Sequence, residues 1–176
     1  MSLTLAQLQT LKAYLDANLS GVFDEEAAAA MNVVASPDYY MWRSSVSRSE
    51  VYHQTSAEGT TWNWNTYKAQ TQGEQGAWTQ MFMGDVGPIG NLNFRQGIQS
   101  IFSGSAAQNT QRDHCFAAGK RKATVAEKLF AVAVTNPPAN TGNNTGLARG
   151  NIGNPDNLGF EGKITQADVS QARNLP

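Results

Sequence analysis

The residues that could carry out nucleophilic or metal chemistry are few. The chain has one cysteine, Cys115, and two histidines, His53 and His114. Adjacent residues on a helix point about 100° apart, so His114 and Cys115 do not make a nucleophile–base pair. A dyad of Cys115 with His53 would have to form in space, and the three residues lack the paired spacing of a zinc site. The pattern favours Cys115 as a small buried apolar side chain.

Carboxylates offer a second possible chemistry, because glycoside hydrolysis uses two of them on either side of the scissile bond. The candidates are scattered along the chain: Glu58, Glu74, Asp85, Asp113 and Glu161. Any two could meet in the folded protein, so a hydrolase stays open as a minor alternative. Such carboxylates are more often solvated groups on the surface or partners at an interface. No glycine-rich phosphate loop of the Walker or dinucleotide type is present.

Two features could contact nucleic acid. Trp62 and Trp64 could present two indoles on one side of an extended segment, as a stacking platform for single-stranded bases. The one dense basic cluster consists of Lys120, Arg121 and Lys122. Such a cluster could lie near DNA through non-specific phosphate attraction. Both features also fit plainer roles, since tryptophans anchor interfaces and cations complement the C-terminal end of a helix. A nucleic-acid-handling accessory protein is therefore an alternative.

The composition is typical of a protein that packs against other proteins. The 176 residues carry a net charge of -1, and 15% of them are charged, against about 25% in typical soluble proteins. A near-neutral chain does not suit strong duplex-DNA binding. A single cysteine permits no intramolecular disulfide. The N-terminal stretch predicts an amphipathic helix rather than a signal peptide, and no membrane-spanning stretch is evident. We therefore expect folding in a reducing cytoplasm.

Apolar spacing predicts a mainly α fold, with a helical bundle body over residues 1–133. The clearest stripe runs through Leu5, Leu8, Leu11, Leu15 and Leu19, with Thr4 as N-cap. Further helices are predicted over 24–35, from Pro37 through Tyr40, Trp42 and Val46, over 66–83, 91–102 and 105–121, and from a capping box at Thr124–Glu127.

Residues 134–176 are predicted to form an extended arm that ends in a short helix starting near Thr165. Within Val134–Lys163, sixteen of 30 residues are Gly, Asn or Pro and only four are charged. A solvated disordered tail would carry more charge, and long structureless loops in compact domains are usually functional. We expect this arm to become ordered on another protein. Its apolar anchors are Leu147, Ile152, Leu158 and Phe160.

Four segments resemble the head-to-tail adaptor, or connector, proteins of tailed bacteriophages. They are GAWTQMF (76–82), NFRQGIQSIFSG (93–104), GKRKATVAEKLFAVAVT (119–135) and NLGFEGKITQADVSQARN (157–174). The resemblance implies a virion structural protein without catalytic activity or cofactor, located at the head–tail junction and assembled in the host cytoplasm. It implies a ring of about twelve copies beneath the portal protein, with the C-terminal arm docked on the portal and a tail or nozzle protein attached below. Packaged DNA then passes nearby without specific contact, close to Lys120, Arg121 and Lys122.

Overall fold

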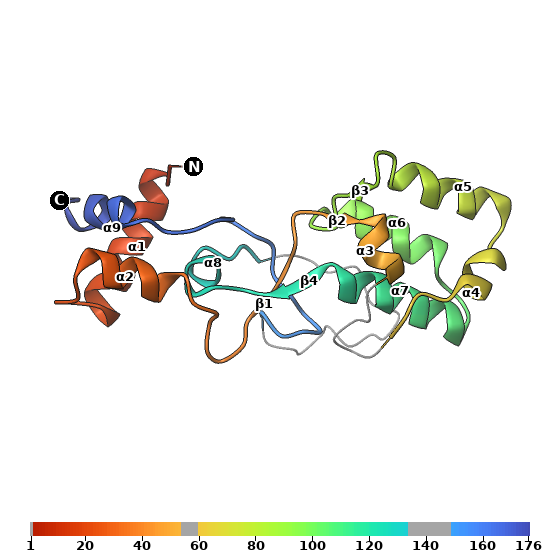
Figure 1. Cartoon of the computed structure of the whole chain (residues 1–176), viewed down its shortest axis with the longest axis horizontal. Helices are drawn as coiled ribbons and strands as arrows, with labels where there is room; N and C mark the ends of the chain where they lie inside the picture. Colours follow the sequence, from red (N-terminus) through yellow and green to blue (C-terminus); the bar gives the residue numbers. More distant parts are fainter. Residues whose placement is uncertain (1, 54–59, 134–148) are drawn as a thin grey trace.

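A computed structural model of the chain describes residues 2–53, 60–133 and 149–176. Within them the fold is mainly α, as predicted, with a few short strands (Figure 1). The helices are α1 (Leu5–Asn18), α2 (Asp24–Met31), α3 (Arg48–His53), α4 (Trp64–Lys68), α5 (Gln72–Met81), α6 (Leu92–Ile101), α7 (Ala106–Ala118), α8 (Val125–Leu129) and α9 (Gln166–Arg173). The strands are β1 (Tyr40–Trp42), β2 (Val46–Ser47), β3 (Val86–Gly87) and β4 (Lys120–Lys122).

Helix starts follow the capping signals of the sequence. Thr4, Thr124 and Thr165 each accept a hydrogen bond from the backbone N–H three residues later, and the residue there bonds back to the cap. This reciprocal pattern satisfies two of the backbone donors that a helix start leaves free. The predicted starts of α1, α8 and α9 are therefore confirmed.

The predicted helix from Pro37 through Val46 is wrong. Tyr40–Trp42 is strand β1, which pairs antiparallel with β4 so that Trp42 lies opposite Lys120. The predicted helix over 105–121 is too long for the same reason, because α7 ends at Ala118 and Lys120–Lys122 becomes the partner strand. Pairing between segments far apart in the sequence outweighs local helix propensity here.

Two hydrophobic cores lie along an elongated molecule (Figure 1). The terminal core joins α1, α2, α8 and α9, and its largest fully buried side chains are Leu11, Leu15 and Met31. The middle core joins α3, α5, α6 and α7 around Trp78, Phe82 and Phe102. β1 and β4 lie between the two (Figure 1).

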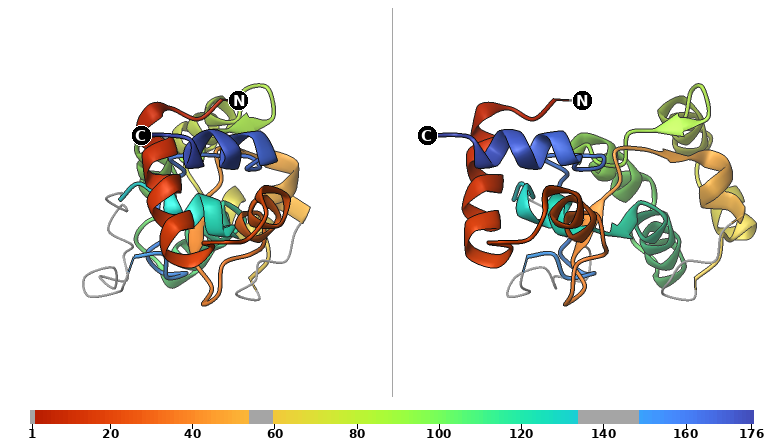
Figure 2. Two further views of the ribbon diagram at one scale, coloured as in Figure 1. Left: turned by 90° about the vertical axis from the view of Figure 1, so that its left-hand side faces the viewer. Right: turned by 60° about the vertical axis from the view of Figure 1, so that its left-hand side comes forward.

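The C-terminal helix completes the terminal core. α9 lies against α1 and α2 and crosses α1 steeply (Figure 2). Its Val169 and Ala172 are fully buried, and Arg173 forms an ion pair with Asp24 at the start of α2. A long C-terminal arm is thus not confirmed, because residues 149–176 pack on the rest of the chain. The predicted boundary at residue 133 stays a prediction, although the terminal core contains residues from both sides of it.

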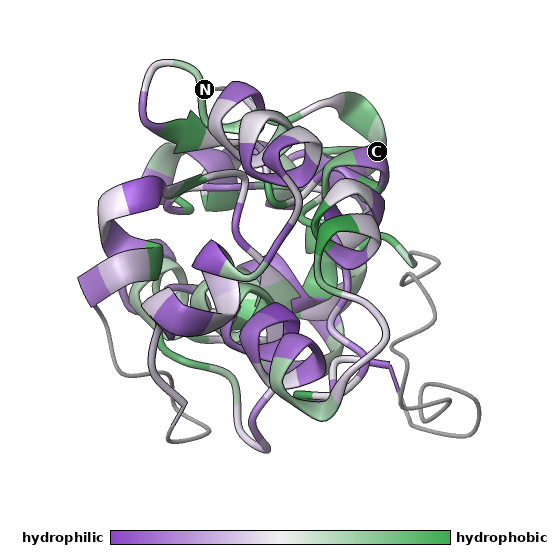
Figure 3. Ribbon diagram, turned by 90° about the vertical axis from the view of Figure 1, so that its right-hand side faces the viewer, coloured by the Kyte–Doolittle hydropathy of each residue, from purple (hydrophilic) through white to green (hydrophobic). Residues whose placement is uncertain are grey.

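Hydrophilic residues extend along much of the ribbon at the end of the molecule that holds the middle core (Figure 3). Many of these polar residues are Asn, Gln, Ser and Thr rather than charged ones. That the surface itself is largely uncharged stays a prediction.

The burial of α9 gives a direct test of its role. Val169→Ala should lower the free energy of unfolding by about 1–3 kcal/mol, because it leaves a cavity between α9 and α1. Urea denaturation measures the loss. Gln171→Ala, at an exposed position of the same helix, is the control and should change stability by less than about 0.5 kcal/mol. Equal effects of the two substitutions would mean that α9 is not part of the core.

Candidate functional site

Each hydrophobic core and the helices around it form one lobe of the molecule. A groove opens where the two lobes meet, and we call it the interlobe groove. Its volume is about 520 Å³. One wall is formed by the end of β1 and the residues after it, Trp42, Arg43 and Ser44, together with residues after β3, Pro88, Gly90 and Asn91. The other wall is the segment Asn157–Glu161. The groove therefore contains Leu158 and Phe160, two residues that the sequence marked as docking anchors.

A buried arginine lies behind the Trp42 wall of the groove. Arg95 is fully buried on α6, with its guanidinium carbon 4.4 Å from the centre of the Trp42 ring. Its Nη1 donates to the carbonyl oxygens of Ile89 at 2.9 Å and Gly90 at 2.8 Å, while its Nε and Nη2 have no hydrogen-bond partner. Burial lowers the pKa of Arg95 to about 10, so the group remains cationic at neutral pH. Sequence periodicity alone did not single out this residue.

The second wall is fixed to β1 through Asp156. Trp42 N–H donates to the Asp156 carbonyl at 2.8 Å, and Asp156 N–H donates to the Tyr40 carbonyl at 3.2 Å. The buried Asp156 carboxylate accepts from the Tyr39 hydroxyl and from Arg149 Nε at 3.0 Å. Burial, together with this hydrogen bond to Asp156, raises the pKa of Tyr39 to about 12. The C-terminal segment is thus anchored through both backbone and side chain.

The four predicted arm anchors have different positions. Leu147 lies outside the described residues. Ile152 and Leu158 are half-buried. Phe160 is buried in the terminal core, edge-to-face with Phe130 at a ring-centre distance of 5.5 Å. In this structure Phe160 therefore packs on its own chain.

The basic cluster forms strand β4, and its side chains are engaged. Arg121 donates to both carboxylate oxygens of the buried Glu127, at 2.7 and 2.6 Å, and lies 3.6 Å from Glu161. Lys122 pairs with Asp38 at 2.7 Å, and the Lys120 ammonium lies over the Trp42 ring at 5.7 Å. These contacts give the three cations structural roles. Their proximity to DNA stays a prediction.

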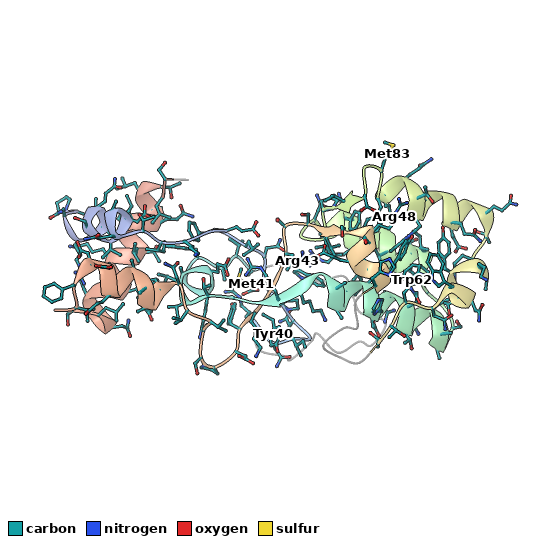
Figure 4. The ribbon with its side chains drawn as sticks, in the orientation of Figure 1. Tyr40, Met41, Arg43, Arg48, Trp62 and Met83 are labelled. Atoms are coloured by element: carbon teal, nitrogen blue, oxygen red, sulfur yellow. The ribbon has the colours of Figure 1, made fainter. Side chains whose placement is uncertain are left out.

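The structure brings the predicted tryptophan pair together. Trp62 is buried and Trp64 is half-exposed, with ring centres 5.7 Å apart in an edge-to-face arrangement. Trp62 points into the lobe that holds the middle core (Figure 4). Tyr52 and Tyr67 contact both indoles. Trp62 thus packs in the core, and Trp64 extends that aromatic cluster to the surface.

The residues considered for catalysis lie in structural positions. Cys115 is fully buried in the middle core, and burial raises the pKa of its thiol. The ring nitrogens of His114 lie 2.7 Å from the Val51 carbonyl oxygen and 3.1 Å from Thr60 Oγ1. Across the described ranges, no group of three His, Cys, Asp or Glu side chains is placed to hold a metal ion.

The described carboxylates of the scattered set each have a partner of another kind. Glu74 caps α5, whereas Asp85 pairs with Arg48, Asp113 with Arg112 and Glu161 with Arg121. Glu58 lies outside the described residues. Each described carboxylate of this set therefore has a helix cap or a cation as its partner.

Comparisons with protein-family models, curated proteins and solved structures find no match to this chain. In the part of the chain that the structure describes, no helix has the length and apolar character needed to cross a membrane.

The buried Arg121–Glu127 pair predicts a pH dependence of stability. Burial disfavours the charged form of Glu127, but hydrogen bonds from Arg121 and Thr124 outweigh it, and the pKa of Glu127 falls below its ordinary value. The stability that Glu127 contributes through its lowered pKa is fully present above the unfolded-state pKa of about 4.3, and it is lost as the pH falls through the folded-state pKa. Glu127→Gln should therefore cost about 1–3 kcal/mol at pH 7 and progressively less at acidic pH.

Urea denaturation at neutral and acidic pH measures this difference. Glu74→Gln is the matched control, since Glu74 occupies the same capping-box position of α5 but is only half-buried and has Thr71 as its hydrogen-bond partner. Its effect at pH 7 should be much smaller than that of Glu127→Gln. A cost for Glu127→Gln that does not change with pH would contradict the proposed ion pair.

Proposed function

We propose that this chain is a virion structural protein, a ring-forming head-to-tail adaptor that docks on a portal protein and connects it to the tail. Four segments resemble such adaptors, as described above. The structural observation that carries the proposal is the exposure of large apolar side chains near both ends of an elongated molecule. Such side chains are typical of sites where proteins associate.

The three most exposed large apolar side chains of the described residues are divided between the two ends that hold the cores; Val33, Val34, Trp64 and Val132 are also at least half exposed. Near the terminal core, Leu5 is 61% exposed and Phe23, just before α2, is 78% exposed. In the lobe of the middle core, Met83 is 84% and Val86 52% exposed, and Met83 lies at the tip of the turn after α5 (Figure 4). Two unlike surfaces that join copy to copy make a heterologous contact, which closes into a ring when the rotation permits.

The proposed portal-docking region still lies in the C-terminal part of the chain, but its residues differ from those expected from the sequence. Because Phe160 lies in the terminal core, the partner-facing residues of the described part are Leu158, which lines the interlobe groove, and the half-buried Ile152. Leu147 completes the proposed docking region from sequence alone. Repetition around a ring compensates for a weak individual contact, because each engaged copy raises the effective concentration of the next.

The alternative function, a nucleic-acid-handling accessory protein, has less support. Arg121 and Lys122 are paired with carboxylates, and a phosphate backbone would have to compete with those partners. The exposed Trp64 keeps base stacking open as a prediction. A hydrolase would need a carboxylate pair, and the described candidates are each engaged elsewhere.

Co-expression with candidate portal proteins tests the proposal. The expected product is a symmetric ring of this chain on one end of the portal, visible by electron microscopy of the purified complex. A monomer that fails to associate with any portal tested, while salt-sensitive binding to an oligonucleotide is retained, would favour the alternative function.

The exposed apolar ends give a separate prediction about ring formation. Phe23→Ser and Met83→Ser should each weaken self-association about tenfold or more if both residues are central contacts. Native mass spectrometry across a concentration series measures the shift from rings to monomers. Gln171→Ala is the surface control, with unchanged assembly expected. Full assembly by both serine variants would rule out the two-surface contact.

A further inference from the structure

A second groove lies over the aromatic cluster of the middle core, and we call it the aromatic groove. Residues Thr60–Asn65 form one side, and Ala107, Thr110 and Gln111 of α7 form the other, enclosing about 570 Å³. Among the described residues that line it, none carries a charged side chain. Trp64 is 50% exposed at its edge, so part of the indole remains accessible to a ligand.

The walls of the aromatic groove are fixed before any ligand arrives. Gln111 Oε1 accepts from Asn63 N–H at 2.8 Å, which ties the loop before α4 to α7. The Asn63 side chain accepts from the N–H groups of Asn65 and Thr66 and so caps α4. Tyr52 supports Trp64, with ring centres 4.9 Å apart. A preformed site loses less entropy on binding.

Two polar groups of the groove lack a hydrogen-bond partner, and both are donors. They are Trp62 Nε1 and Gln111 Nε2, on residues that are 8% and 1% exposed. Buried donors in proteins nearly always have an acceptor. A ligand that supplies acceptors therefore matches the polarity of this wall better than one that supplies donors.

Proline-containing segments have this chemistry. Proline keeps its carbonyl oxygen but has no N–H, and proline-rich peptides dock as preformed extended helices in grooves lined with aromatic side chains. A single-stranded nucleic acid fits less well, because no cation lines the groove to meet its phosphates.

The chain itself contains such a segment. Residues 135–146 read TNPPANTGNNTG, with Pro137 and Pro138 adjacent and no charged residue. This stretch lies outside the residues that the structure describes. Fifteen residues, 134–148, separate Ala133 from Arg149, and such a length spans at most about 50 Å when extended. Because both ends are attached, the reach of the prolines is much shorter: Pro137 is the fourth residue after Ala133 and lies at most about 15 Å from it. A neighbouring molecule that binds the prolines must therefore approach the chain close to Ala133.

We propose that the aromatic groove of one copy binds the Pro137–Pro138 segment of a second copy. The inference rests on the proposed ring and identifies one of its copy-to-copy contacts. Each copy then offers one groove and one proline segment, so the contact is heterologous and repeats around a closed ring. The uncharged groove and the uncharged segment match each other in polarity.

Peptide binding tests the groove directly. The receptor is the full chain with Pro137→Ala and Pro138→Ala, so that its own segment does not compete. The peptide TNPPANTGNNTG should perturb the tryptophan signals in heteronuclear NMR and bind saturably. Trp64→Ala or Thr110→Lys in the receptor should weaken binding about tenfold or more, whereas Gln171→Ala, at an exposed site on α9 outside the groove, should not.

Three results would overturn the groove assignment. They are equal binding of a peptide with alanines at both proline positions, equal binding by the Trp64→Ala and Gln171→Ala receptors, and no saturable binding at millimolar peptide. Tighter, salt-sensitive binding of an oligothymidylate would assign the groove to nucleic acid instead.

Mixing two variants tests whether the segment comes from a second copy. Trp64→Ala chains lack the groove, and Pro137→Ala/Pro138→Ala chains lack the segment. Each alone should fail to self-associate through this contact, while a mixture should give heterodimers by native mass spectrometry, since one intact groove meets one intact segment. No heterodimer in the mixture would overturn the proposal. Portal binding is measured separately, so rings that form with both variants would sink this contact and leave the adaptor function standing.

Discussion

The pairing of β1 with β4 is the constraint on which the rest of the structure depends. The two strands lie far apart in the sequence and join antiparallel between the two hydrophobic cores. Trp42 of β1 packs in the middle core, while Arg121 of β4 holds Glu127 at the start of α8, beside the terminal core. Asp156 then extends the same region by bonding to β1 through its backbone. One short ladder thus sets the relative position of both cores and of the C-terminal segment.

The junction between the two cores buries polar and charged groups, although burying apolar side chains there would cost less free energy. Arg95 is buried against Trp42 with two donor nitrogens unmatched, and Asp156 is buried with Tyr39 and Arg149 as partners. Buried charges add little net stability and are retained in some proteins because they specify one arrangement. At a joint between two cores, that specificity fixes one orientation. The interlobe groove is lined by the same elements, so its shape depends on these polar contacts.

How well each structural feature could be predicted from the sequence depends on how far apart the interacting residues lie along the chain. Capping boxes at Thr4, Thr124 and Thr165 act within four residues, and the sequence indicates them correctly. The apolar stripe of α1 predicts its buried Leu8, Leu11 and Leu15 in the same way. Strands β1 and β4 are stabilised by each other, so the local pattern around Tyr40 and Arg121 gave helices instead. Both grooves form between segments distant in the sequence, and their residues could only be assembled by the fold.

Phe160 shows why an apolar residue in a Gly- and Asn-rich stretch is an ambiguous signal. A hydrophobic side chain there can bind a partner or fasten the stretch to its own chain, and both need a low-charge surrounding. Phe160 packs on its own chain because Phe130 and the apolar residues of α1 and α8 form a surface that the phenyl ring of Phe160 covers. The opposite condition distinguishes Phe23, just before α2, and Met83, in the turn after α5: no described part of the chain covers them. In the proposed ring, another copy covers these side chains without any change in the fold.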